Sequence, residues 1–497
     1  MGITGRRFCF AAILWLSLAL PDLGARYSFG WDSSQFDRAV SDFDITRHQP
    51  HPPGYPLWVL ALRGLSPVVG NPNRAQVVLA LAFTLAALWF FHALARGLLG
   101  HQAALSATVL LAFSPVVCLN ARSSQVYAVD LFLFCFGGWL AAGLCSGRSH
   151  LAAPGVALVA ITVGFRPSGA AFVAPLLCFA LWRCAGKRPF HAAAAVLAGA
   201  ACLLAWLAPT ALLTGGFRAL AALNHAQMVS SFRKTSIFFG ARPIVHARML
   251  AEVSLYFAMA LCVFIPALAA SRRPRDQDTE PRQAWATPLF FFLWMAPNLV
   301  LLYFFHCPQP GYILPSLPPL ALLLAWRAQL PLKGTQWTAA GLAVALLAGY
   351  FPYERFMRPE SSALPFLLLR STPRVARLIE TSQHDIRTFI DSMPGRPEGK
   401  LVVCLRSGFE APNIRTVTYD FPDVTWAAPG SGSLFHSPAN LRSVAWLCDR
   451  AGPSKATQAQ YPGARRIGGN ALYSFWTLSV DDRRLEEVLK AVTGANP

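Results

Sequence analysis

Long apolar runs recur over residues 1–350, and short polar or charged connections separate them. A helix rises 1.5 Å per residue, so about 20 residues cover the roughly 30 Å hydrocarbon core of a bilayer. Leucine and alanine fill the runs at about this length. The pattern predicts about eleven transmembrane helices, near residues 8–24, 74–97, 102–119, 125–146, 150–165, 167–185, 190–214, 248–271, 285–306, 311–329 and 335–352.

Two of these spans have an alternative. As one helix, residues 150–185 would be about 54 Å long, and Arg166-Pro167 interrupts them, so two short spans or a broken pair are expected. Residues 8–20 follow Arg6-Arg7 and also fit the apolar part of a signal peptide. We favour an uncleaved first helix; cleavage would leave the rest of the topology unchanged.

The composition supports a membrane protein. Hydrophobic residues make up 54% of the chain and charged residues 13%, against about 25% charged residues in soluble domains. A cytosolic enzyme, a secreted disulfide scaffold and a disordered chain are excluded. The 43 Lys+Arg exceed the 24 Asp+Glu, which in a soluble protein would suggest a nucleic-acid partner.

The positive-inside rule places connections that are rich in Lys and Arg on the cytoplasmic side. Most of the basic surplus lies in the connections on the same side as the N-terminus, so the N-terminus is predicted to be inside. The charge is therefore mainly an orientation signal, and no nucleic-acid partner is predicted. With an odd number of spans, residues 353–497 lie outside. Residues 1–352 are thus predicted to form an all-α transmembrane domain.

Residues 353–497 differ in character and predict a small extracytoplasmic α/β domain. Short strands are expected near 401–405, 416–419, 444–447 and 471–475, and helices near 372–392 and 481–492. Cys404 and Cys448 fall here, and either a disulfide or two buried thiols fit. The cysteine spacing matches no metal motif.

Two long outer segments carry the polar residues, at 25–73 and 215–247. A connection between helices needs only about five residues, so the length and polarity of the first segment indicate a site; it holds Asp32, Asp37, Asp42, Asp44, His48 and His51. The second segment has basic residues and no acidic one, against the orientation rule. It fits a phosphate-bearing ligand or a solvated loop, and contains Arg218, Arg233, Lys234 and Arg242.

Several motifs occur in a recognisable order: Trp31-Asp32-Ser33, His51-Pro-Pro-Gly-Tyr-Pro56, Gln125-Val-Tyr-Ala-Val-Asp130, Gly164-Phe-Arg-Pro167 and Gln309-Pro-Gly-Tyr-Ile-Leu-Pro-Ser-Leu-Pro-Pro319. Together they resemble the GT-C superfamily of membrane glycosyltransferases, which use polyprenyl-phosphate-linked sugars. Protein O-mannosyltransferases and the lipid A aminoarabinose transferases belong to it. The first two motifs are most similar to the bacterial dolichyl-phosphate-mannose–protein mannosyltransferase-like group.

The resemblance implies eleven or more helices, amphipathic helices in the first outer loop, and a catalytic acid there. Asp32 matches that acid. The family often has a second, adjacent acid, where this chain has Ser33 and Gln35. Whether Asp37 or Asp44 shares the work is therefore open. No metal ligand is assigned, and a divalent cation stays an open question.

Sugar transfer from a polyprenyl phosphate needs a base for the acceptor hydroxyl and positive charge for the departing phosphate. An aspartate with a pKa near 4 is ionised at neutral pH, and general-base catalysis typically contributes roughly 10²–10⁴-fold. Arginine suits bidentate phosphate binding. The candidates for this charge are Arg122, Arg166, Arg233, Lys234 and His51.

Four residues have competing interpretations. Asp130 is expected about one turn inside a span, where an acid is costly; it either belongs to the site or pairs with Arg122, or it snorkels to the interface. His306 and Tyr312 flank an outer helix junction and either bind substrate or belong to the aromatic belt. Arg166 either binds phosphate or snorkels.

The sequence thus predicts a glycosyltransferase of the outer face of a bacterial inner membrane. Its donor is a polyprenyl-phosphate-linked sugar, its acceptor a hydroxyl of a protein, lipid or glycan, and membrane lipid surrounds it. The alternative is a polytopic transporter of a lipid-linked or small anionic substrate. Transporters usually place polar residues near the middle of broken helices, whereas the polar clusters here lie in outer loops.

Overall fold

The computed structural model describes residues 31–266, 285–307, 309–327, 384–393, 400–404, 425–427, 443–449, 465–469 and 473–478. Described residues 39–327 belong to one compact unit. Described residues 31–38, and those from 384 onward, belong to a second.

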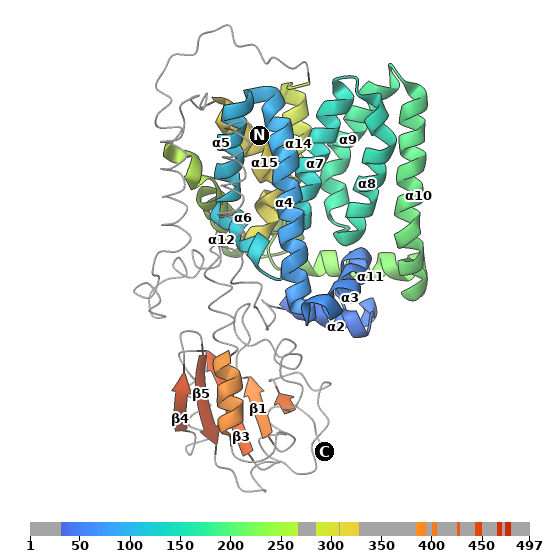
Figure 1. Cartoon of the computed structure of the whole chain (residues 1–497). Helices are drawn as coiled ribbons and strands as arrows, with labels where there is room; N and C mark the ends of the chain where they lie inside the picture. The colour runs from blue at the N-terminus through green and yellow to red at the C-terminus, as the bar shows by residue number, and fades with distance from the viewer. Residues whose placement is uncertain are drawn as a thin grey trace. The chain divides into compact units, whose positions relative to one another are not determined.

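The first unit is helical (Figure 1). Its α-helices are α3 (Pro56–Val69), α4 (Pro72–Leu99), α5 (His101–Ala112), α6 (Pro115–Arg122), α7 (Ala128–Cys145), α8 (Ala152–Phe165), α9 (Gly169–Ala185), α10 (Pro189–Leu213), α11 (Phe217–Arg233), α12 (Pro243–Leu261), α14 (Pro288–Val300) and α15 (Leu317–Arg327). Helix α2 (Trp31–Ser41) precedes them. Short turns complete the unit: η2 (Ile45–Arg47), η3 (Ser149–Leu151), η4 (Ile237–Phe239), η5 (Cys262–Phe264), the π-helical η6 (Leu301–Phe305) and η7 (Pro310–Ser316).

The chain is a polytopic membrane protein. In the described ranges, five helices are long and apolar enough to cross a membrane: Pro72–Leu99, Ala128–Cys145, Pro189–Leu213, Pro243–Phe264 and Pro288–Phe305. Shorter apolar helices cover the predicted spans at 150–165, 167–185 and 311–329. The predicted spans at 8–24 and 335–352 lie outside the described residues, so the count of eleven stays a prediction.

Two breaks interrupt the predicted spans. The expected interruption at Arg166-Pro167 separates α8 from α9. The predicted span at 102–119 consists of two helices, α5 and α6, which together are long and apolar enough to cross a membrane and are bent by 62°. Pro115 explains the bend: it has no N–H to continue the ladder of α5, and it suits the first turn of a new helix.

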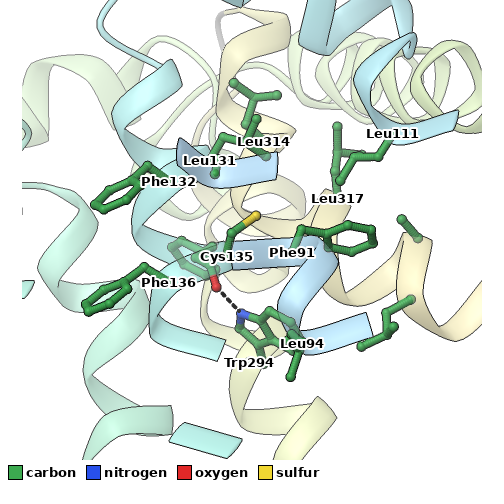
Figure 2. Packing of buried hydrophobic residues seen from close by; sticks show 14 of the residues in the cluster. Phe91, Leu94, Leu111, Leu131, Phe132, Cys135, Phe136, Trp294, Leu314 and Leu317 are labelled. Atoms are coloured by element: carbon green, nitrogen blue, oxygen red, sulfur yellow. Dashed lines mark hydrogen bonds between the residues drawn. The ribbon is translucent and has the colours of Figure 1, made fainter. Parts of the chain in front are cut away.

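Helix α7 lies in the middle of the first unit, packed against α4, α8 and α9. Two glycines allow this. A Cβ on Gly138 would lie 2.3 Å from the Trp294 ring, and one on Gly137 2.7 Å from Val173. Trp294 of α14 reaches across and donates its indole N–H to the carbonyl oxygen of Phe134, 3.2 Å away (Figure 2). These contacts hold the middle of α7 within the bundle.

Helices occupy much of the two outer segments. Helices α2 and α3 occupy the first segment, as the resemblance implies; their orientation to a membrane stays a prediction. The segment 215–247 was predicted as a loop, yet α11 fills residues 217–233, which are rich in helix-forming Ala, Leu, Gln and Met. Helices α3 and α11 lie at the same end of the bundle, and both contact α10 (Figure 1).

The described strands of the second unit form one five-stranded sheet of order β2-β1-β3-β5-β4. Strand β1 (Lys400–Cys404) runs parallel to β2 (Thr425–Ala427) and β3 (Ser443–Asp449). Strand β5 (Tyr473–Leu478) runs antiparallel to β3 and to β4 (Arg465–Gly469).

Strands β1, β3 and β5 lie where the sequence predicts strands, whereas β2 and β4 were not predicted. A helix at 384–392 lies within the predicted helix 372–392. The predicted strand at 416–419, the predicted helix at 481–492 and the side chains of Cys404 and Cys448 lie outside the description. The domain boundary at residue 352 stays a prediction.

Candidate functional site

A buried ion pair joins two of the predicted site residues. Asp130 lies in the first turn of α7, and Arg166 lies directly after α8. The Nε–H of Arg166 donates to Oδ2 of Asp130, and only 4% and 3% of the two residues are exposed. A Cβ on Gly169 would lie 3.1 Å from Oδ1 of Asp130, so α9 approaches the carboxylate closely. Of the alternatives left open by the sequence, Asp130 thus pairs with Arg166 and not with Arg122, and the Arg166 side chain is buried.

Aromatic rings hold the guanidinium group of Arg166 in place. Its Cζ lies 4.2 Å from the centre of the Tyr127 ring and 5.7 Å from that of Tyr312. The two tyrosine rings are 5.3 Å apart. Tyr127 precedes Asp130 by three residues, one helical turn, so both point to the same side of α7. A Cβ on Gly311 would lie 2.3 Å from Tyr127, so only glycine allows this approach.

The His51-Pro-Pro-Gly-Tyr-Pro56 motif adds a third tyrosine. The phenol of Tyr55 is buried in the neighbourhood of Arg166 and lies 3.1 Å from Nε2 of His51. Gly54 has a φ of +101°, and a Cβ there would lie 2.4 Å from Ile45. The motif therefore depends on this glycine to turn Tyr55 toward the arginine.

His306 extends the cluster beyond Tyr312. The two rings meet edge-on, with centroids 5.7 Å apart. Nδ1 of His306 lies 3.0 Å from the hydroxyl of Thr235, at the end of the segment that follows α11. Burial and the positive charge of Lys234 lower the pKa of His306 to about 4, so its imidazole is neutral at physiological pH.

The terminal nitrogens of Arg166 remain available. In the described part of the chain, Nε makes the hydrogen bond of this guanidinium and no hydrogen bond reaches either Nη. Guanidinium groups bind carboxylate and phosphate oxygens with paired N–H donors. A buried Arg166, oriented by Asp130 at one edge and by Tyr127 on its face, is therefore suited to hold an oxyanion.

The structure brings together His51, Asp130, Arg166, His306 and Tyr312 through the contacts above. Arg233 and Lys234 are exposed at the end of α11, and Lys234 acts on His306 electrostatically. Arg122 is buried in the last turn of α6. Asp32 lies in the first turn of α2 and Asp37 further along it, half-buried and buried respectively, among the residues of the second unit.

Asp44 forms its hydrogen bonds with residues that follow it closely in the chain. It accepts hydrogen bonds from the backbone N–H and the hydroxyl of Thr46, at 2.9 and 2.6 Å, and from Nε of Arg47 at 2.6 Å. These bonds lower the pKa of Asp44 to about 2. Asp44 caps η2 and orders the loop ahead of the proline motif. Its geometry does not support a share in catalysis.

Three residues of this cluster escaped the sequence analysis: Tyr55, Tyr127 and Thr235. Two had a signal, since Tyr55 and Tyr127 lie inside motifs that were recognised. Their spacing from His51 and Asp130, four and three residues, could have marked them. Thr235 had no such signal, because its contact with His306 joins segments 71 residues apart.

No metal centre emerges from the described residues, where no group of three or more His, Cys, Asp or Glu side chains is placed to hold an ion. The described residues therefore suggest no ligands for a divalent cation, and the use of one stays an open question.

No family model and no curated protein matches this chain. Solved structures do match, among them two of ArnT. The crystal structure of ArnT from Cupriavidus metallidurans bound to undecaprenyl phosphate matches with a TM-score of 0.51 and 15% identity, covering 97% of this chain and 99% of that one. Its apo form matches with a TM-score of 0.52 and 13% identity, covering 94% and 97%.

ArnT is an aminoarabinose transferase of the GT-C superfamily. The chain has the fold of ArnT. This confirms the fold that the resemblance implies, and the likeness covers nearly the whole length of the chain. At 15% identity the likeness concerns the fold.

Proposed function

We propose that this protein is a glycosyltransferase that moves a sugar from a polyprenyl-phosphate carrier to a hydroxyl group at the outer face of a bacterial inner membrane. The acceptor is a protein, a lipid or a glycan. The C-terminal α/β domain then lies on the same, extracytoplasmic side, as the charge distribution of the connections predicts.

One observation carries the proposal: a GT-C fold holds a buried arginine whose terminal nitrogens have no hydrogen-bond partner in the described ranges. A buried cation that served stability alone would be expected to satisfy all its donors. The structure of ArnT with undecaprenyl phosphate shows that a protein of this fold binds a polyprenyl phosphate. We assign the same class of ligand to Arg166.

The proposed reaction divides the work among few residues. A carboxylate, Asp32, takes the proton of the acceptor hydroxyl as its oxygen attacks the anomeric carbon. The bond between that carbon and the phosphate oxygen breaks, and the phosphate leaves with the electron pair. Arg166 stabilises the added negative charge, and the exposed Arg233 and Lys234 draw the anionic head group toward the site.

The remaining candidates have supporting roles in this proposal. Tyr127 and Asp130 orient Arg166, and Tyr55 with His51 closes the side formed by the proline motif. Arg122 and Asp37 are buried polar residues for which we propose substrate contacts.

The test is an assay of the purified full chain with radiolabelled undecaprenyl-phosphate mannose, arabinose and glucose. The Asp32→Asn variant is expected to lose roughly 10²–10⁴-fold of the transfer rate, the usual contribution of a general base. Asp42→Asn is the matched control, because Asp42 belongs to the same segment and forms an exposed ion pair with Arg47. A wild-type protein that releases sugar from none of the three donors would refute the proposal.

The alternative of a transporter gains no support from the ion pair. Asp130 lies in the first turn of α7, and Arg166 lies between α8 and α9. The sequence assigns both helix ends to the outer side, whereas transporters usually place their binding residues near the bilayer midplane. A transporter would also tolerate Asp32→Asn, so the same assay separates the two functions.

A further inference from the structure

The end of α14 is tied to the segment that follows α11. Helix α14 continues into the π-helical η6, whose last carbonyl groups have no partner further along the helix. Ser236 donates its hydroxyl to the carbonyl oxygen of Phe304 at 2.6 Å, and Thr235 donates to that of Phe305 at 2.8 Å. Two neighbouring hydroxyls thus cap the helix immediately before His306.

The position of one proton follows from these contacts. The Thr235 hydroxyl has a single hydrogen and lies near the carbonyl oxygens of Phe305 and Ser231, at 2.8 and 3.3 Å, and Nδ1 of His306, at 3.0 Å. The shortest of these contacts is to the carbonyl oxygen of Phe305, which can only accept, so we assign the hydroxyl proton to that carbonyl. The ring nitrogen must then donate to the hydroxyl oxygen. His306 is therefore protonated on Nδ1, and Nε2 has a free lone pair.

The surroundings keep this imidazole neutral. Lys234 is the charged group that acts on His306, and Tyr312 faces it edge-on. His246 lies behind Thr235, with Nδ1 3.1 Å from the Thr235 carbonyl oxygen. Lys234 and burial both oppose a positive charge on His306, so Nε2 stays a hydrogen-bond acceptor at physiological pH.

Nε2 makes no hydrogen bond with any residue in the described ranges. Tyr312 contacts both residues: its ring centroid lies 5.7 Å from the centroid of the His306 ring and 5.7 Å from Cζ of Arg166. A sugar ring is of similar size to a phenol ring. A sugar on a phosphate bound at Arg166 would therefore extend along Tyr312 toward His306.

We propose that His306 binds a hydroxyl group of the transferred sugar through Nε2, and that Thr235 is the positioning residue that fixes this tautomer. The proposal rests on the proposed function, and it divides the cluster by chemistry. Arg166 recognises the phosphate by charge. His306 is neutral and has a lone pair on Nε2. It therefore accepts a hydrogen bond from an O–H group and does not offset the negative charge of the phosphate.

The tautomer is tested without any turnover, by ¹⁵N NMR of the full chain labelled at histidine in lipid nanodiscs. The His306→Phe variant identifies the signals of His306. At neutral pH we expect a protonated Nδ1 and an unprotonated Nε2. Thr235→Val should mix the two tautomers, while Thr235→Ser, which keeps the hydroxyl, should preserve the wild-type pattern. A protonated Nε2 in the wild-type protein overturns the inference whatever the function.

The hydroxyl contact is tested by adding undecaprenyl phosphate in one arm and its mannose, glucose and arabinose conjugates in the other. We expect Nε2 to shift with a conjugate and not with the bare carrier. Thr235→Val should raise the KM for the conjugate about tenfold, the effect of one lost hydrogen bond, and Thr235→Ser should restore it. Affinity for the bare carrier should stay within about twofold.

The outcomes separate the two proposals. An equal Nε2 shift with the bare carrier would make His306 a phosphate ligand, and no shift with any conjugate would remove the sugar contact; either result overturns the inference. A wild-type protein that binds the conjugates and shifts Nε2 but transfers no sugar would contradict the proposed transferase and leave the His306 contact standing.

Discussion

Arg166 uses three parts of its guanidinium group for different purposes. Nε binds the carboxylate of Asp130, the flat face lies against Tyr127, and the terminal nitrogens make no hydrogen bond with other described residues. A buried ion pair is weak evidence for stability, because the cost of removing two charges from water offsets their attraction. The arrangement is better explained by preorganisation for an anionic ligand.

This interpretation predicts different effects for single and double substitutions of the pair. Asp130→Ala leaves a buried, uncompensated guanidinium and should lower the free energy of unfolding by about 3–5 kcal/mol. The double variant Asp130→Leu with Arg166→Met should recover most of that loss and still lack sugar transfer. Thermal unfolding in detergent and the transfer assay measure the two effects. A fully active double variant would remove the pair from the site.

Asp44 gives a prediction about pH. Its pKa falls from 3.8 unfolded to about 2 in the folded chain, first through its bonds to Thr46 and Arg47. A lowered pKa means that the stabilisation is present above the unfolded value and is lost as pH falls toward the folded value. Exchange of amide hydrogens in residues 45–48 should be about fivefold faster in Asp44→Ala than in wild type at pH near 6. The difference should shrink as pH falls through about 2.

The matched control for this measurement is Asp42→Ala, since Asp42 contacts Arg47 and caps no turn. Solvent screens that exposed ion pair, so the control should exchange nearly as the wild type does. A control as fast as Asp44→Ala would assign the protection to Arg47 and not to the cap.

At the scale of elements, the length of the apolar runs predicted where the described membrane helices lie. It did not predict elements whose structure depends on a proline, on helix propensity or on strand pairing. The bend between α5 and α6 comes from Pro115 inside an otherwise apolar run. Helix α11 has too few apolar residues to resemble a span, so propensity and not hydropathy was its only signal. Strands β2 and β4, of three and five residues, form through pairing with neighbours that a sequence pattern does not reveal.

Helix packing yields a prediction at two glycines. Gly138→Ala places a methyl group about where the Trp294 ring stands, and crowding of this kind usually costs about 1–3 kcal/mol. Gly97 is a matched control in α4, because a Cβ there meets nothing within 4 Å. Gly97→Ala should be neutral or stabilise by up to about 1 kcal/mol. Equal melting temperatures for the two variants would contradict the packing of α7 against α14.

For the whole molecule, the candidate site agrees with the orientation that the charges predict. Tyr55, Asp130, Arg166, Thr235 and His306 lie in different connections or helix ends, and the sequence assigns each to the outer side. Asp130 and Arg166 were predictable from motifs, whereas Thr235 had no signal in the sequence. The contacts among these residues were not predictable, because the pairing of Arg166 with Asp130 and the stacking on Tyr127 and Tyr312 depend on which helices pack together.

The orientation itself is testable with exposed residues at the two ends of α10. Lys187 precedes this helix and Arg218 follows it, and both are exposed. If positive charge marks the inner side, Arg218→Cys should react with a membrane-impermeant maleimide added to intact spheroplasts, and Lys187→Cys only after lysis. The chain has 11 native cysteines, so labelling is measured as the increase over the parent protein. The reverse pattern would place Arg166 and its neighbours at the cytoplasmic face, where an extracytoplasmic acceptor could not reach them.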